Sequence, residues 1–351
     1  MADVVDSNTE DQAIQPNKGL FLVIHNKEKD KYYNPVVKDG VTVDWSWKGA
    51  AGKASFSVYN DALLEFEEGD EVFIKYDETK FFKGFVFTRG RDKDGWINVT
   101  AYDQLRYFKN KEVYIFIGKT ASEIIKAIAS DLQLNIGEIA DTNYVIPKYR
   151  GSNTTIFDIV QDVLDMTTEN ETDENENKAL RLFSMYDDFG ALTVKPLEDM
   201  QTNLLIDDAT AQNFRYESTI DKDTYNQIQF YYDDKDTGTR VKRRYPEESA
   251  SENIKRWGIL RLTENINPKK PLNYEEMIKK KLAYYNRVRR SLTINNAFGD
   301  CRIRGGSMLY VRLDLGDMML EKQMIVSHVT HKFTDNIHLM DLELRGDVIT
   351  G

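Results

Sequence analysis

The chain has 351 residues, which is too long for one ordinary domain and suits two or three. Hydrophobic residues make up 41% and charged residues 30%, with no apolar run near the roughly 18 residues of a membrane span, so we expect a soluble globular protein. The single cysteine, Cys301, excludes an internal disulfide framework and a cysteine-based metal cluster. Residues 1–15 lack the basic start and apolar core of a signal peptide, which predicts a protein made in a cytosol.

Acidic residues are concentrated in two short stretches. The formal net charge is −11, but nine acidic residues lie in 1–15 and 169–177, which hold no basic residue, and the remainder carries only −2. Because both stretches are acidic and offer little to a core, we expect residues 1–18 to form a disordered tail and 169–177 a mobile loop. The nearly neutral body argues against a nucleic-acid binder, whose affinity comes mainly from a basic face.

Short β-strands are predicted from residue 20 to about residue 114. Apolar and polar residues alternate in 41–47, 56–58 and 72–76, the pattern of strands with one buried face. Asp94-Gly95 is typical of a hairpin turn. Because some six short strands follow one another with no helical pattern between them, we expect residues 19–115 to form a first β domain, either a small barrel or a sandwich.

Two helices are predicted in the next region. The sequence TASE at 120–123 has the pattern of a capping box, and apolar residues at helical spacing follow it. A second apolar series, starting near Thr154, indicates another helix. Residues 180–185 and 191–195 are predicted to be two strands joined by a turn. We therefore expect a small α/β insert at residues 116–203 that contains the acidic loop.

Strands return from residue 204, and one long helix is predicted among them at 273–291. Its apolar residues cover one stripe at helical spacing while lysines and arginines lie opposite. The fold class expected for the whole chain is α+β, mainly β. Two β-barrel domains, 19–115 and 204–351, would flank the α/β insert, with the helix packed on the second barrel.

Two motifs that suggest nucleotide chemistry fail on spacing or context. Residues 47–54 (WKGAAGKA) have two residues between their glycines where a phosphate loop has four, and no helix is predicted after them. Asp188-Phe189-Gly190 matches a kinase metal-binding tripeptide without the accompanying kinase loops, and is predicted to be a hairpin turn.

The spacing of the histidines and carboxylates does not indicate a metal site or a catalytic site either. His328 and His331 would fall on opposite faces of a strand, so they cannot chelate one ion, and His25 and His338 add no ligand spacing. Three carboxylate pairs, of the kind a glycosidase needs at a controlled separation, lie at predicted strand ends or turns: Glu67/Glu68, Asp187/Asp188 and Asp207/Asp208. The basic stretches 240–244 and 279–290 are interpreted as solvated faces. We expect no catalytic, cofactor-binding or metal site, no cofactor and no sequence-specific nucleic-acid binding.

Five segments resemble, in order, the XkdQ-type proteins of contractile phage tails and prophage-like particles, relatives of the late-control D baseplate-hub proteins. They are 101–112 (AYDQLRYFKNKE), 218–228 (STIDKDTYNQI), 253–260 (NIKRWGIL), 324–333 (MIVSHVTHKF) and 338–344 (HLMDLEL). None is a catalytic signature. The acidic loop is longer than expected of this family.

The resemblance implies a structural baseplate hub and not an enzyme. Two barrels per chain would each mimic a tail-tube subunit, so a trimer would offer six equivalent units to the hexameric tube and a threefold platform to the spike. The implied partners are other copies of the chain, the tail tube protein, the central spike protein, other baseplate and LysM-type tail proteins, and the tape-measure protein. The chain would assemble in the host cytoplasm and end in the baseplate of a phage, prophage-like particle or tail-like bacteriocin. A tail-associated peptidoglycan hydrolase and a cell-wall-binding module remain the alternatives.

Overall fold

In a computed structural model, the structure describes residues 3–5, 19–170, 181–210, 213–233, 239–245, 252–266, 274–316 and 319–346. Most of the expected acidic tail and residues 171–177 of the acidic loop lie outside this part of the chain. Within the expected tail, however, β1 (Asp3–Val5) pairs with β3 (Lys31–Asn34). The chain divides into two compact units, residues 1–215 with 292–344 and residues 216–291 with 345–351. The predicted boundaries near 115 and 203 both fall inside the first unit, and as domain limits they remain predictions.

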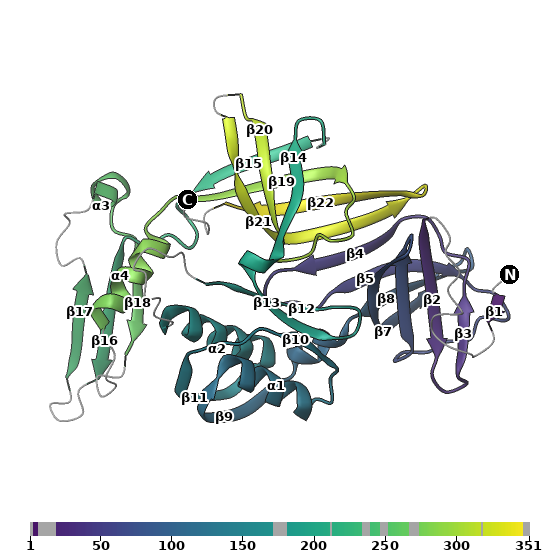
Figure 1. The fold of residues 1–351 in the computed structure, drawn as a ribbon, viewed down its shortest axis with the longest axis horizontal. Helices are drawn as coiled ribbons and strands as arrows, with labels where there is room; N and C mark the ends of the chain where they lie inside the picture. The colour runs from purple at the N-terminus through teal and green to yellow at the C-terminus, as the bar shows by residue number, and fades with distance from the viewer. Residues whose placement is uncertain are drawn as a thin grey trace. The chain divides into compact units, whose positions relative to one another are not determined.

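A 14-stranded sheet dominates the first unit (Figure 1). Its strand order is β1-β3-β2-β6-β7-β8-β5-β4-β21-β22-β19-β15, with β20 on β21 and β14 on β20. The early strands are β2 (Leu20–Asn26), β4 (Val41–Ser46), β5 (Lys53–Tyr59), β6 (Glu71–Tyr76), β7 (Thr79–Arg91) and β8 (Trp96–Tyr102). The late strands are β14 (Gln201–Asp207), β15 (Asn213–Thr219), β19 (Arg289–Phe298), β20 (Met308–Asp314), β21 (Met319–Thr334) and β22 (Ile337–Arg345).

Strand β4 joins the early strands to the late ones. It pairs antiparallel with β5 on one side, where Val43 faces Ala54, and with β21 on the other, where Val43 faces His331. Its side chains alternate as predicted, with Val41, Val43 and Trp45 buried. The mainly β, α+β class is therefore confirmed, but the expectation of two barrels is corrected. Because β4 is shared, the strands form one continuous open sheet, and no closed barrel occurs among the described residues.

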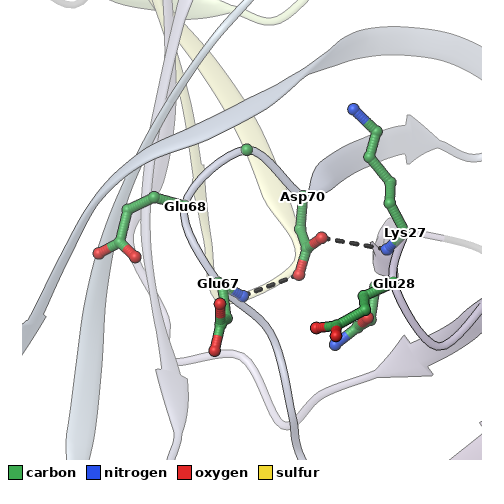
Figure 2. Close-up of a pocket in the computed structure, with 7 residues that line it drawn as sticks. Lys27, Glu28, Glu67, Glu68 and Asp70 are labelled. Carbon is green, nitrogen blue, oxygen red and sulfur yellow. Dashed lines mark hydrogen bonds between the residues drawn. The ribbon is translucent and has the colours of Figure 1, made fainter.

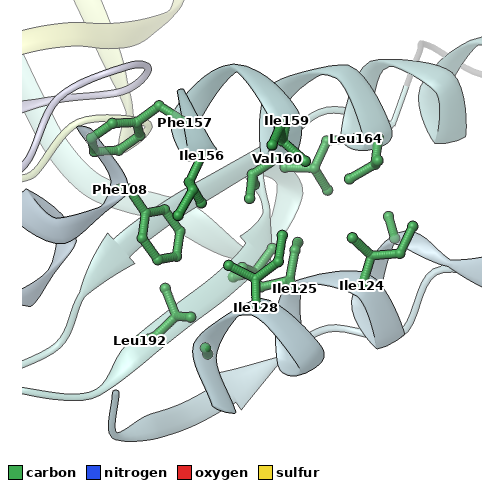
Figure 3. Packing of buried hydrophobic residues seen from close by; sticks show 14 of the residues in the cluster. Phe108, Ile124, Ile125, Ile128, Ile156, Phe157, Ile159, Val160, Leu164 and Leu192 are labelled. Atoms are coloured by element: carbon green, nitrogen blue, oxygen red, sulfur yellow. The ribbon is translucent and has the colours of Figure 1, made fainter. Parts of the chain in front are cut away.

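The α/β segment of the first unit holds a compact core between two helices (Figure 3). Ile124, Ile125 and Ile128 of α1 (Ala121–Asp131) meet the buried side chains of α2 (Ile156–Asn170). The predicted capping box is confirmed, since Thr120 Oγ1 accepts from Glu123 N–H and the Glu123 carboxylate accepts from Thr120 N–H. Helix α2 ends at Asn170, so residues 169 and 170 of the predicted acidic loop belong to it.

Short strands surround these helices. The antiparallel ribbon of β9 (Lys111–Thr120) and β11 (Val145–Thr155) packs on α1 and α2, and β9 crosses the predicted boundary at 115. A three-stranded sheet has the order β10-β13-β12. Its strands are β10 (Ile136–Ile139), β12 (Phe183–Asp187) and β13 (Leu192–Pro196), and two 3-10 helices, η1 (Gln104–Lys109) and η2 (Leu197–Met200), complete the segment.

The second unit is a small sheet with two helices. Strand β16 (Gln227–Asp233) pairs antiparallel with β17 (Arg240–Tyr245) and parallel with β18 (Arg261–Asn265). Helix α3 (Glu252–Trp257) precedes β18, and α4 (Tyr274–Tyr285) contacts β16. The prediction of one helix over 273–291, packed on a second barrel, is wrong in both respects. The helix ends at Tyr285 and lies against this small sheet, and residues 289–291 begin β19.

Candidate functional site

An acidic hollow of about 260 Å³ lies between the β2–β3 turn and the loop before β6 (Figure 2). The carboxylate of Asp70 accepts hydrogen bonds from Lys27 N–H at 3.0 Å and from Glu67 N–H at 2.7 Å. Asp70 thus ties two loops together. The predicted pair Glu67/Glu68 lies at a strand end, and Glu68 is within 3.4 Å of Arg89 Nε. No group of histidine, cysteine and carboxylate side chains suited to a metal ion occurs among the described residues.

A second group of carboxylates is buried at the junction of three parts of the first unit. Asp103 follows β8, and its carboxylate accepts from Gly52 N–H at 2.7 Å and Leu105 N–H at 3.0 Å. Burial, together with the nearby charge of Asp187, raises the pKa of Asp103 well above its usual range. A Cβ atom on Gly52 would lie 2.4 Å from Asp103 Oδ2. Gly52, taken from sequence as part of a failed phosphate loop, is therefore required for this close approach.

Asp187, at the end of β12, and Arg304, in the loop before β20, form the rest of this junction. Asp187 ends β12 and accepts from Gly190 N–H at 2.6 Å, and burial raises its pKa to about 6. Arg304 Nη1 donates to the Asp187 carbonyl at 3.2 Å, and its guanidinium lies 4.4 Å from the Tyr186 ring centre. The same guanidinium is 3.5 Å from the exposed carboxylate of Asp188. The predicted pair Asp187/Asp188 is thus divided between a buried and a solvated carboxyl.

Further hydrogen bonds fix this junction. Trp47 Nε1–H donates to the Phe183 carbonyl at 2.9 Å, and Ser184 Oγ donates to the Gly305 carbonyl at 2.9 Å. The buried carboxyl groups accept hydrogen bonds from backbone amides, while Arg304, which also stacks on an aromatic ring, donates to the backbone carbonyl of Asp187. This arrangement binds β4, β12 and the loop before β20 to one another, which is a structural task.

A buried chain of hydrogen bonds links the late strands to that loop. His331 Nε2 lies 2.9 Å from the Ile303 carbonyl, which can only accept, so Nε2 carries the proton and His331 Nδ1 accepts from His338 Nε2–H at 2.8 Å. His338 Nδ1 is then an acceptor, 3.9 Å from Cys301 Sγ. Burial raises the pKa of Cys301 to about 12, so the thiol remains protonated as the donor. Every ring nitrogen of the two histidines has a partner.

The remaining candidates occupy structural positions. His25 lies between Glu71 at 2.9 Å and Asp30 at 3.0 Å, and His328 Nδ1 contacts Ser46 Oγ at 2.9 Å. The predicted turn at Asp188-Phe189-Gly190 is confirmed, with positive φ at Phe189 and Gly190. Asp207 accepts from backbone N–H groups of the turn that follows β14.

The basic stretches are also structural. Arg240, in β17, donates to both carboxylate oxygens of Asp233, at 2.7 and 3.0 Å, and Lys281, in α4, pairs with Glu264 at 3.1 Å. Sequence reasoning missed both buried groups. The turn residues Asp335 and Asn336, which have positive φ, could have signalled that His331 and His338 meet across a hairpin.

A sequence model described as YQBQ-like matches residues 41–345 of this chain. The chain belongs to the YQBQ-like family. Two curated relatives come from Bacillus subtilis (strain 168). "Uncharacterized protein YqbQ" is 26% identical over 289 residues, and "Phage-like element PBSX protein XkdQ" is 25% identical over 291 residues. Each alignment covers 79% of this chain and 81% of the relative. The predicted resemblance to XkdQ-type proteins is thereby confirmed.

Solved structures share the fold of this YQBQ-like chain. A 43 kDa tail protein of prophage MuSo2 from Shewanella oneidensis matches with a TM-score of 0.65 at 10% identity, over 93% of this chain and 98% of its own. A tail protein from Neisseria meningitidis MC58 matches with a TM-score of 0.64 at 12% identity, over 94% and 97%. An E. coli type VI secretion component, described as similar to the T4 tail proteins gp27 and gp5, has a TM-score of 0.53 at 8% identity, over 92% and 76%. No described helix is long and apolar enough to cross a membrane.

Proposed function

We propose that the chain is a structural subunit of the baseplate hub in a contractile, phage-like tail. The observation that carries the proposal is the extent of the shared fold, which covers 93% of this chain and 98% of the MuSo2 tail protein. A fold shared from end to end leaves little of the chain for a separate catalytic domain. The relationship to XkdQ, a protein of the phage-like element PBSX, supports a tail role independently.

Placement at the hub rests on a more distant likeness. The E. coli type VI component with the same fold is described as similar to the T4 tail proteins gp27 and gp5. A Francisella PdpA–VgrG complex also contains the fold, with a TM-score of 0.53. These likenesses support a position in which the chain contacts a central spike protein on one side and the tail tube protein on the other.

The action of such a hub is mechanical. The early strands β2–β8 and the late strands β19–β22 would each take the place of one tube subunit, so three chains would present six units to a hexameric tube. Because β4 hydrogen-bonds to both β5 and β21, the early strands and the late strands would move together. The tape-measure protein and other baseplate proteins would be further partners, no cofactor would be needed, and assembly would take place in the host cytoplasm.

Labelling intact particles tests this placement. Antibodies against the purified chain, applied to particles of the host and seen by electron microscopy, should mark the end of the tail distal to the head. Antibodies against the tube protein serve as the matched control and should label sheared tubes along their length. Label from the first antibody along the tube, or at the head end, would contradict a baseplate position.

A further inference from the structure

The outer face of β9 carries an apolar stripe. Val113, Ile115 and Ile117 are 65%, 53% and 68% exposed. The residues between them, Tyr114 and Phe116, pack on the core of α1 and α2. A ribbon with one buried face normally carries polar residues on the other. Three adjacent β-branched residues on the solvent side are thus a departure, and a contiguous exposed apolar patch indicates a contact surface.

The same strand has an open hydrogen-bonding edge. Within the described part of the chain, β9 pairs with β11 and with no other strand. Soluble proteins normally blunt such an edge with charges, proline or a bulge, because unpaired N–H and C=O groups accept a further strand. On β9 the lysines lie only near the ends, at Lys111 and Lys119. An extended segment could therefore add to this edge and cover the stripe at the same time.

Four basic residues beside the apolar stripe indicate the charge of the segment that would bind there. Lys111 and Lys119 flank it along β9, and Lys148 and Arg150 face Ile117 and Ile115 from β11. All four cations are exposed, and none makes an ion pair within the described ranges. The one acidic residue on β9 is Glu112. A segment with carboxylates near its ends would be attracted to these four cations. The electrostatic attraction would also raise its association rate.

The same charges disfavour pairing of β9 with β9 of a second copy of this chain. In an antiparallel pairing of two β9 strands centred on Ile115, Lys111 of each copy would face Lys119 of the other. In a parallel pairing in register, each lysine would lie beside its own counterpart. Like charges directly opposite one another on neighbouring strands are destabilising.

We propose that the outer edge of β9 is a docking site for an extended segment of a different protein, with apolar residues at alternate positions and carboxylates at its ends. The segment becomes a third strand beside β9. Its apolar side chains cover Val113, Ile115 and Ile117, and its carboxylates meet the lysines near the strand ends. This inference is independent of the proposed role in a tail.

Binding of a synthetic peptide to the full chain tests the proposal. The probe alternates valine and threonine and has glutamate at each end, and a control peptide has lysine at each end. The glutamate peptide should bind, and should bind more weakly as salt is raised. Ile115→Lys should weaken it about tenfold or more, because the substitution removes apolar surface that the peptide would bury. Ile337→Lys, at an exposed isoleucine on β22, is the matched control and should not change it.

Hydrogen exchange locates the bound peptide. Amides of residues 111–119 should exchange more slowly in its presence, and those of β22 should not. The proposal is overturned if neither peptide binds, if both bind equally, if Ile337→Lys weakens binding as much as Ile115→Lys, or if protection appears elsewhere. A dimer of the free chain that Ile115→Lys abolishes would assign the edge to a second copy instead and would also overturn it.

Discussion

The hydrogen-bond chain from Cys301 through His338 to His331 contains two neutral imidazoles. Burial lowers the pKa of His331 well below its usual range and that of His338 to about 4. In the unfolded chain both titrate near 6.5. The unfolded state therefore binds more protons between about pH 6.5 and pH 4, and the folded state loses stability as the pH falls through that window. Asp187 acts in the opposite direction, because its pKa is raised to about 6 and the folded state retains its proton longer.

Replacing His338 should isolate the histidine contribution. Gln can still donate to His331 Nδ1 but does not titrate, so His338→Gln should lose less free energy of unfolding than the native chain between pH 7 and pH 4. The difference should approach the order of 3 kcal/mol, at about 1.4 kcal/mol per pKa unit. Urea unfolding at a series of pH values measures it. His328→Gln is the control, because His328 lies on the opposite, part-exposed side of β21. Equal pH slopes in the native chain and His338→Gln would refute this reading.

Strand alternation was enough to place His328 and His331 on opposite faces, and the structure confirms it with His331 fully buried. Strand alternation alone could not predict the contact between Cys301 and His338. That contact depends on the path of the loop after β19, where a Cβ atom on Gly299 would lie 2.1 Å from the His338 ring. A close approach between segments far apart in sequence leaves no local periodicity. For the same reason the carboxyls of Asp103 and Asp187 were not linked before the structure was known.

Among the elements, β4 depends most on a neighbour from the far end of the chain. The loop before β20 crosses its end so closely that a Cβ atom on Gly305 would lie 2.2 Å from the Ser46 carbonyl carbon and 2.3 Å from Trp47 N. Both atoms are backbone and cannot swing away. The Trp47 N–H also donates to the Ser327 carbonyl of β21 at 2.9 Å. The continuity of the sheet across β4 thus requires glycine at position 305.

Gly305→Ala should accordingly lower the free energy of unfolding by about 1–3 kcal/mol or more, because the added methyl group forces the loop away from β4. Gly90→Ala is the matched control. Gly90 lies in β7 with no atom within 4 Å of its would-be Cβ, so its change should stay within about 0.5 kcal/mol. Chemical denaturation of both variants at neutral pH measures the two values. A Gly305→Ala chain as stable as Gly90→Ala would show that the junction does not hold the early and late strands together.

Local patterns predicted several elements well and their long-range pairing poorly. The capping box at Thr120 and the alternation from Val41 to Trp45 each describe one segment, and both are confirmed. The pairing of β4 with β21 joins residues such as Thr330 and Asp44, a relation that period-2 alternation cannot specify. The helix predicted to reach residue 291 ends early for a tertiary reason. Buried Arg289 donates to the Asp223 carbonyl, which commits the segment to β19.

For the molecule as a whole, the proposal of a structural part implies that the chain catalyses no cell-wall hydrolysis. The carboxylate of Asp187 accepts a hydrogen bond from Gly190 N–H in a hairpin turn, and that of Asp188 pairs with Arg304. Purified chain incubated with bacterial sacculi should release no soluble muropeptides above a heat-treated sample, as measured by chromatography. Release that disappeared in Asp187→Asn or Asp188→Asn would instead support the hydrolase alternative.

The claim of the tail-hub account that is easiest to contradict is the number of copies of the chain in each tail. If the early and late strands each replace one tube subunit, a closed ring needs three chains joined head to tail, and such contacts close only at the correct rotation. Each junction should bury roughly 1,200–2,000 Å² to be stable. A cryo-electron microscopy map of the distal tail end measures this directly. The account predicts three copies of the chain, seen as threefold density with six similar β units beneath the first tube ring. Six copies of the chain, or a single β unit per chain in contact with the tube, would contradict it.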